Sequence, residues 1–131
     1  WHHVIDIVPT IYEATGIEQP SMVNGVTQKP IEGVSMAYSF DSPKAPSTRH
    51  TQYFEVFGHR AIYHDGWLAC TTPPYGGPWV DQTRIERVDV IDGYQWELYH
   101  VDNDFSEADN LAGTYPDRLH DLQLLLSLIH I

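Results

Sequence analysis

Asp65-Gly66 restricts the fold of this chain more than any other feature of its sequence. The dipeptide stands between two short runs of aromatic and β-branched residues, "RAIYH" (60–64) and "WLACTT" (67–72). Asp-Gly between such runs favours a two-residue turn that joins antiparallel strands. Similar runs occur at "TQYFEVFG" (51–58) and "QWELYHV" (95–101). The spacing therefore predicts a small antiparallel sheet of about four strands.

The N-terminal segment carries a helical pattern. Apolar residues recur there at helical spacing: Val4, Ile7, Val8, Ile11 and Ala14. Gly16 occupies the position of a C-cap glycine, and Asp6 is a candidate N-cap. With Asp6 as the cap, Pro9 falls in the first turn, where its missing N–H costs little. We predict a helix of about a dozen residues within 1–16.

A second helical pattern lies near the C-terminus, at "YPDRLHDLQLLL" (115–126). Pro116 falls in its first turn, and Leu119, Leu122 and Leu126 share one face. In the closing "LLLSLIHI" the apolar residues no longer follow that face, so residues 127–131 are interpreted as a non-native tail. Helices on either side of an antiparallel sheet give an α+β fold.

Residues 17–50 form a connection rich in turn-forming residues. The four prolines at positions 20, 30, 43 and 46 exclude a long helix, and Asn24-Gly25 is a turn signal. Loops of this length in a compact domain usually have a function or lie across another surface. The predicted organisation is a helix (1–16), a connection (17–50), an α+β subdomain (51–126) and the tail.

Charge and cysteine content narrow the possible partners. Eighteen Asp and Glu against seven Lys and Arg give a formal charge of −11. Nucleic acids and anionic membranes require clustered cations, so neither is an expected partner. The single cysteine, Cys70, forbids an intrachain disulfide but assigns no compartment, whether periplasmic, secreted or cytoplasmic. The chain opens without Met or a signal peptide, which suggests a piece of a longer polypeptide.

The acidic stretch "DNDFSEADNLAG" (102–113) resembles a calcium loop only in part. Asp102, Asp104 and Ser106 occupy the first three ligand positions of an EF-hand. Glu107 stands where the invariant Gly is required, and Gly113 where the bidentate Glu is required. We therefore interpret the stretch as the exit from a strand, in which the acids form turns and cap backbone amides.

The histidines do not indicate a metal site. Adjacent His2 and His3 diverge by about 100° on a helix, and His59 and His64 point to opposite faces of an unbroken strand. Cys70 has no cation nearby in sequence to lower its pKa, so it is expected to pack as a small hydrophobe. We predict no metal ligands and no catalytic residues in this chain.

Two weaker candidates remain for substrate contacts. His59-Arg60 is expected in a turn between strands, where Arg could pair with an anion or with one of the many acids. "PPYGGPW" (73–79) is a flexible aromatic loop that could line a cleft or lie on the surface. Neither a G-x-S-x-G motif nor a phosphate-binding glycine loop is present.

Four blocks, in order, resemble the C-terminal part of bacterial arylsulfatases in the alkaline phosphatase-like superfamily. They are "HVIDIVPTIYEATGI" (3–17), "VNGVTQKPIEGVSMAYSF" (23–40), "QYFEVFGHRAIYHDGWLA" (52–69) and "WELYHVDNDFSEADNLA" (96–112). The last is similar to the family's "WELYDL" strand exit, with His100 in place of the usual Asp. The resemblance implies the C-terminal α+β subdomain of a larger α/β sulfatase.

The resemblance also implies hydrolysis of sulfate esters. In that family a Cys or Ser in C/S-x-P-x-R becomes formylglycine, and calcium with Lys and His stabilises the sulfate charge. Cys70 is followed by "TTPP" and does not fit the motif. We therefore expect the catalytic groups on a missing N-terminal domain, the substrate to be a small sulfate ester, and this part alone to be inactive. In this chain, the rim of the substrate cleft would consist of His59, Arg60 and the loops 17–50 and 72–95.

Two other interpretations remain open. A free-standing α+β module could bind a carbohydrate or another ligand, with Trp67, Trp79 and Trp96 as stacking platforms. A phosphatase or phosphonate hydrolase of the same superfamily would share the subdomain and differ upstream. A module should fold by itself, whereas a subdomain should expose the apolar helix face of Val4, Ile7 and Ile11 and aggregate.

Overall fold

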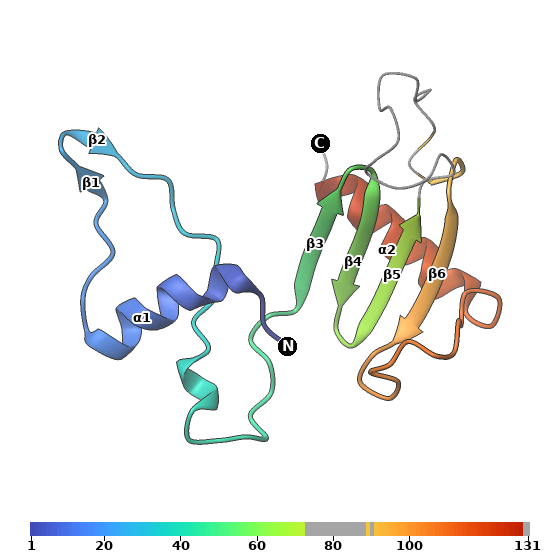
Figure 1. Cartoon of the computed structure of the whole chain (residues 1–131), viewed down its shortest axis with the longest axis horizontal. Coiled ribbons are helices and arrows are strands. Elements are labelled where there is room, and N and C mark those ends of the chain that lie inside the picture. Colours follow the sequence, from blue (N-terminus) through green and yellow to red (C-terminus); the bar gives the residue numbers. More distant parts are fainter. Residues whose placement is uncertain (73–88, 90, 130–131) are drawn as a thin grey trace. The chain divides into compact units, whose positions relative to one another are not determined.

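The computed structural model describes residues 1–72, 89 and 91–129. The chain divides into two compact units, Trp1–His50 and Thr51–Ile131, which we describe one at a time (Figure 1). The four-stranded antiparallel sheet and the helix at each end of the chain confirm the predicted α+β class. The loop "PPYGGPW" and Trp79 lie outside the described residues.

The first unit begins with a single helical stretch made of two parts. A 3₁₀ turn, η1 (Val4–Asp6), runs directly into α1 (Ile7–Thr15), so Pro9 lies in the first turn of α1 as predicted. Gly16 ends the helix in the left-handed conformation, with φ 67°, and its N–H donates to the carbonyl of Glu13. The predicted C-cap is confirmed, since glycine adopts this conformation without steric cost.

Asp6 occupies the N-cap position of α1, as predicted, but its side chain does not cap the helix. The carboxylate of Asp6 makes no capping hydrogen bond to α1. It turns back instead to accept the N–H of His3, while the His3 side chain accepts the N–H of Ile5 and caps η1. A 3₁₀ turn capped by His3 therefore precedes α1, which itself begins directly after Asp6.

The connection contains one short hairpin and one helical turn. Strands β1 (Met22–Val23) and β2 (Val26–Thr27) pair antiparallel around Asn24-Gly25, whose φ angles are 50° and 80°. Positive φ at both turn residues is the conformation that Asn-Gly favours, which confirms this turn. The helical turn is η2 (Ala37–Ser39).

The second unit is built on one antiparallel sheet. Its strands are β3 (Thr51–Val56), β4 (His59–His64), β5 (Trp67–Thr72) and β6 (Gln95–His100), in the order β3-β4-β5-β6. Asp65 and Gly66 join β4 to β5 with φ angles of 45° and 82°, as the sequence predicts.

The turn between β3 and β4 differs from the prediction. His59 and Arg60 were expected in this turn, but both belong to β4, and the turn residues are Phe57 and Gly58, with φ 50° and 85°. Phenylalanine rarely adopts a positive φ, so the presence of Phe57 does not predict a turn at this position. Glu55 stabilises the turn by accepting the Gly58 N–H on its side chain at 3.0 Å.

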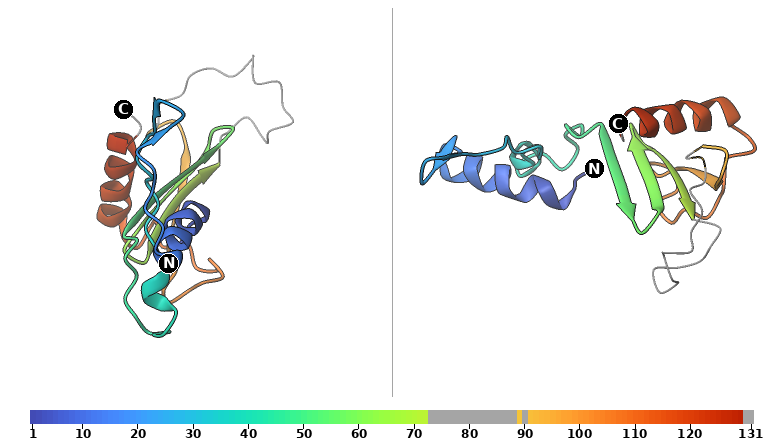
Figure 2. Two further views of the ribbon diagram at one scale, coloured as in Figure 1. Left: turned by 90° about the vertical axis from the view of Figure 1, so that its left-hand side faces the viewer. Right: turned by 90° about the horizontal axis from the view of Figure 1, so that it is seen from above.

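Helix α2 (Pro116–Ile129) covers one face of this sheet, as Figure 2 shows. The core joins sheet residues that share this face, Ile62, Ala69 and Leu98, to Leu122 and Leu126 of the helix. Each of these five side chains is at most 1% exposed. Leu119 packs against the same cluster, which confirms the predicted apolar face of the helix.

The helix also includes residues assigned to the predicted tail. Ser127, Leu128 and Ile129 continue α2, with Leu128 71% exposed, while residues 130 and 131 lie outside the described part of the chain.

The acidic stretch after β6 is a strand exit, as interpreted from the sequence. The carboxylate of Asp104 accepts the Asp109 N–H and the Ser106 hydroxyl, each at 2.9 Å. The side-chain oxygen of Asn110 accepts the N–H groups of Leu98 and Ala112. These bonds hold the segment back against the edge strand β6.

Candidate functional site

His59 and Arg60, the two predicted substrate contacts, do not point to one place. They are consecutive in β4, and consecutive strand residues point to opposite faces of the sheet. Arg60 shares a face with Ile62, the face that α2 covers, and pairs across the strands with Glu55. His59 therefore lies on the opposite face, so the two side chains cannot bind one small group together.

Arg60 is partly buried and keeps nitrogen atoms without a hydrogen-bond partner. Its guanidinium carbon lies 5.4 Å from the centre of the Tyr94 ring, a cation–π contact. Nε and Nη1 of Arg60, and Nε2 of His59, are buried and make no hydrogen bond within the described part of the chain. Buried polar nitrogens are usually paired, so Arg60 retains capacity for an acceptor and the His59 ring retains capacity for a hydrogen-bond partner.

Cys70 is unsuited to nucleophilic chemistry. It pairs with Glu97 across β5 and β6, and its sulfur lies 3.9 Å from the Glu97 carboxylate. Burial, together with the nearby charges of Glu97 and Glu107, raises the pKa of the Cys70 thiol to about 12. Since the thiolate is the nucleophile, Cys70 stays protonated and inert at neutral pH.

The histidines and acids do not form a metal centre in the described residues. No three His, Cys, Asp or Glu side chains there lie close enough to hold an ion. His64 Nδ1 lies 2.8 Å from the Thr51 hydroxyl, and His64 Nε2 lies 3.6 Å from the carboxylate of Asp65.

Among the described residues, no helix combines the length and apolar character needed to cross a membrane.

Two of the three proposed tryptophan platforms are described, and they differ in role. Trp96 packs against the core, and its indole N–H donates to the Ile91 carbonyl at 2.9 Å. Trp67 contacts His100 and Tyr115 edge to face, with ring centres 4.4 and 5.4 Å apart. Only Trp67 therefore lies beside other aromatic rings in the described residues.

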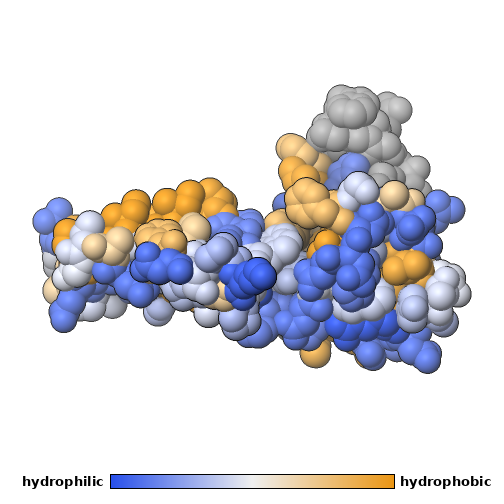
Figure 3. Space-filling model, turned by 90° about the horizontal axis from the view of Figure 1, so that it is seen from below, coloured by the Kyte–Doolittle hydropathy of each residue, from blue (hydrophilic) through white to orange (hydrophobic). Residues whose placement is uncertain are grey.

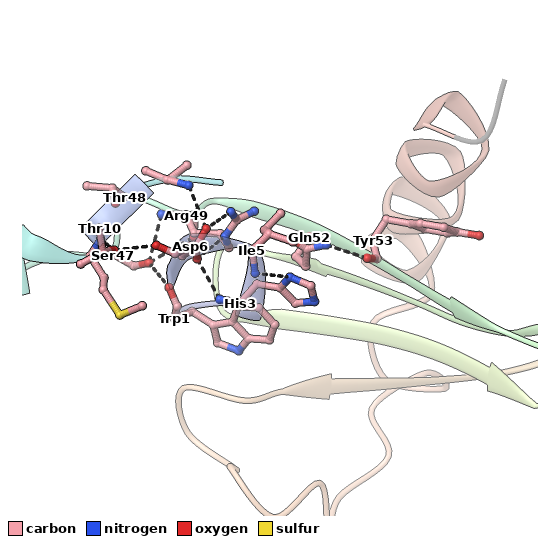
Figure 4. Close-up of polar contacts among 12 residues, drawn as sticks. Trp1, His3, Ile5, Asp6, Thr10, Ser47, Thr48, Arg49, Gln52 and Tyr53 are labelled. Carbon is pink, nitrogen blue, oxygen red and sulfur yellow. Dashed lines mark hydrogen bonds and ion pairs between the residues drawn. The ribbon is translucent and has the colours of Figure 1, made fainter. Parts of the chain in front are cut away.

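The strongest polar cluster was not predicted from sequence and lies in the first unit. The fully buried carboxylate of Asp6 accepts hydrogen bonds from Arg49 Nε at 2.8 Å and from Arg49 Nη2 (Figure 4). It also accepts the N–H groups of His3 and Val34, both at 2.8 Å. The Thr10 hydroxyl donates to the Asp6 carbonyl and accepts the N–H of Met36. This cluster fastens the connection to α1.

The opposite side of α1 is apolar and exposed. Val4, Ile7, Val8 and Ile11 fall on one helical stripe and are between 47% and 68% exposed. Figure 3 shows hydrophobic side chains gathered along the part of the molecule that this unit forms. The helix thus buries polar Asp6 and Thr10 and exposes its apolar side, the reverse of an ordinary surface helix. The exposure of Val4, Ile7 and Ile11 is what we predicted for a subdomain.

Comparisons by sequence identify no relative. The sequence matches no family model. It also matches none of the curated proteins.

Comparison of structures finds proteins with the same fold. One is a protein labelled BT33336S-sulf, described under the metabolism of multiple glycosaminoglycans by Bacteroides thetaiotaomicron, with a TM-score of 0.57 and 16% identity. Another is BT4656, described as in complex with its substrate D-glucosamine-2-N,6-O-disulfate, with a TM-score of 0.55 and 20% identity. The matches cover 95% of this chain but only 24% and 23% of those chains. The chain therefore has the fold of about a quarter of each of these longer proteins.

Proposed function

We propose that this chain is the C-terminal part of a sulfuric ester hydrolase and that it acts as a structural support of that enzyme. The observation that carries the proposal is the inverted helix α1. Its apolar stripe is exposed while Asp6 and Thr10 on its other side are buried. An apolar patch of this kind marks a surface that another part of a protein covers.

The fold comparisons support the same proposal. Both solved chains are about four times longer than the region they share with this chain, and their descriptions name sulfated sugars or glycosaminoglycans. The four sequence blocks that resemble arylsulfatases lie between residues 3 and 112, and the structural matches cover 95% of the chain. We infer that the missing N-terminal catalytic domain covers the stripe of Val4, Ile7, Val8 and Ile11.

The bond-breaking groups are proposed to lie upstream. The formylglycine nucleophile and the calcium ion would both be held there, since Cys70 is protonated and the described residues gather no set of metal ligands. Such an ion would stabilise the crowded negative charge of a sulfate ester, and the nucleophile would attack its sulfur atom. The part of the chain described here supplies scaffold rather than chemistry.

His59 and Arg60 remain proposed rim residues, but as separate contacts. Because they point to opposite faces of β4, at most one can reach a given sulfate group. In the complete enzyme, Arg60→Ala and His59→Ala should each be assayed for KM. If neither variant loses substrate affinity, both residues are removed from the site. The loops 17–50 and 72–95 are the other proposed parts of the rim.

The experiment that tests this function uses the gene upstream of Trp1. We expect a C/S-x-P-x-R motif there and sulfatase activity in the complete polypeptide, abolished when the motif Cys or Ser is replaced by Ala. The 131-residue chain alone should leave aryl sulfates untouched. A start codon just before Trp1, or ester cleavage by the chain alone, would contradict the proposal.

A comparison of three substrates would determine which ester the complete enzyme prefers. An aryl sulfate, a glucosamine 6-sulfate and an aryl phosphate should be compared in the complete enzyme. Preference for the aryl ester would support the arylsulfatase interpretation, and preference for the sugar would place the enzyme with the sugar sulfatases. Preference for the phosphate would replace sulfate chemistry by the phosphatase alternative.

A further inference from the structure

A cavity of about 470 Å³ opens beside the end of β6, in the second unit. Seven residues line it: Trp67, His100, Asn103, Asp104, Asp109, Leu111 and Tyr115. They come from the start of β5, the strand exit after β6 and the residue just before α2. The volume falls within the range of small-ligand pockets and suits one ring rather than a long chain.

Aromatic residues line part of this cavity. The Trp67 ring meets His100 at an interplanar angle of 74° and Tyr115 at 68°. The three rings therefore form one aromatic cluster, held by edge-to-face contacts. Tyr115 is 48% exposed, which leaves part of its ring available. Aromatic rings suit the C–H faces of a sugar and also attract cations.

Residues with hydrogen-bonding side chains also line the cavity. Asp104 is held by the Asp109 N–H and the Ser106 hydroxyl, and these bonds lower the pKa of its carboxyl, so it is ionised at neutral pH. Asp109 adds a second carboxylate and Asn103 adds an amide. Nδ1 of His100 is buried and makes no hydrogen bond to any described residue.

The charge of the lining side chains favours one class of ligand over another. Two carboxylates line the cavity and no Lys or Arg does, so a sulfate or a carboxylate would be repelled. The nearest guanidinium, Arg118, lies 5.8 Å from the centre of the Trp67 ring and reaches toward the carbonyl of His64. It is not among the lining residues.

We propose that this cavity binds one unsulfated amino sugar, with its ring against Trp67 and Tyr115 and its ammonium group beside Asp104 and Asp109. The hydroxyl groups have Asn103 and His100 as partners. The site is independent of the proposed hydrolysis, because none of its residues has a role in that reaction. In a longer enzyme, such a site would hold a sugar unit that carries a free amine.

The test is an NMR titration at pH 6 of the chain that carries Val8→Lys and Ile11→Lys, which remove the apolar stripe of α1 and leave the cavity untouched. The ligands are D-glucosamine, N-acetyl-D-glucosamine and D-glucosamine 6-sulfate. Glucosamine should bind at least tenfold tighter than the acetylated sugar, which lacks the charge, and tighter than the sulfated one. No saturable binding of glucosamine would overturn the proposal, and so would equal affinity for the three sugars.

Matched variants locate the binding. Tyr115→Ala and Asp109→Asn should each weaken glucosamine binding about tenfold or more. Phe105→Ala and Asp117→Asn are the controls, since Phe105 is 90% exposed, Asp117 is exposed, and neither lines the cavity. Equal losses in the controls would overturn the assignment. Circular dichroism checks that each variant is folded, and Asn103→Ala provides a further lining variant. Because no turnover is measured, failure here leaves the hydrolase proposal standing, and the reverse also holds.

Discussion

Arg49 donates through both Nε and Nη2 to the carboxylate of Asp6, a residue with no exposed surface. The two residues are 43 positions apart, and the pair closes the connection onto the start of the helical stretch. Each partner satisfies a charge that would otherwise be buried alone. The pair therefore determines whether the first unit keeps its arrangement.

Replacing either Asp6 or Arg49 alone should lower the free energy of unfolding far more than replacing both by apolar residues. We expect Asp6→Leu or Arg49→Met alone to destabilise the first unit by about 3–5 kcal/mol, because each leaves an unpaired buried charge. The double variant should recover part of this loss, although the N–H groups of His3 and Val34 stay without their acceptor. Urea unfolding followed by circular dichroism measures the three variants. A double variant less stable than both singles would contradict this account.

The same pair predicts how stability depends on pH. Burial raises the pKa of the Asp6 carboxyl, but the hydrogen bonds from Arg49 and from the amides of His3 and Val34 outweigh it and hold the pKa well below its usual range. A depressed pKa gives stability above the unfolded value of about 4, and this stability is lost as pH falls below it. Unfolding measured between pH 7 and about pH 2 should show this loss, which begins near the unfolded value and continues as pH falls toward the depressed pKa of the folded state. Asp6→Asn should show less of it.

Gly66→Ala should destabilise the second unit by two separable effects. Gly66 has φ 82°, and an added Cβ would lie 2.5 Å from Oδ2 of Asp102. Gly25, with φ 80° and nothing within 4 Å of an added Cβ, isolates the backbone effect. We expect about 1 kcal/mol for Gly25→Ala and about 2 kcal/mol for Gly66→Ala. Thermal unfolding measures both.

The Asp102 side chain provides the control for the glycine experiment. In the background of Asp102→Ala, the cost of Gly66→Ala should fall to the backbone value, because the collision is gone. An unchanged cost would show that the collision contributes nothing.

Cys70 should resist alkylation. With its pKa raised to about 12 by burial and by Glu97 and Glu107, the thiolate is scarce at pH 8. Iodoacetamide should react with Cys70 at least about a hundredfold more slowly than with a free cysteine. Glu97→Gln should speed the reaction, and unfolding in urea should restore the ordinary rate. Fast alkylation of the folded chain would contradict the burial of this thiol.

The apolar stripe of α1 should control self-association of the chain. Replacing Val8 and Ile11 by Lys should reduce aggregation, because both side chains are about half exposed. Leu128→Lys is the control, since Leu128 is 71% exposed at the other end of the chain. Light scattering measures the effect. In a complete enzyme, the same double substitution should instead lower stability, because the stripe is then covered.

The sequence could predict the local features whose cause lies in a few neighbouring residues. Asn24-Gly25 and Asp65-Gly66 adopt the positive φ angles that these dipeptides favour, and Gly16 ends its helix. The helical spacing of Leu119, Leu122 and Leu126 also predicted which side of α2 is buried.

Features that depend on distant residues could not be predicted in the same way. Nothing near Asp6 in sequence indicates that its carboxylate pairs with Arg49, so the local pattern predicts a helix cap instead. Phe57 adopts a positive φ against its own preference. The turn therefore falls at Phe57 and Gly58 and not at His59 and Arg60. The cavity beside β6 brings Trp67 together with side chains from residues 100–115, and only the fold reveals that they meet.

The hairpin of the connection also bears on protein engineering. Its strand residues Met22, Val23, Val26 and Thr27 are exposed, whereas the anchoring amides belong to Val34 and Met36, further along the chain. Lengthening a loop between fixed ends costs little, since the closure entropy grows only with the logarithm of its length. The Asn24-Gly25 tip is therefore a suitable place to graft an epitope or a fluorescent reporter without disturbing the anchored helix.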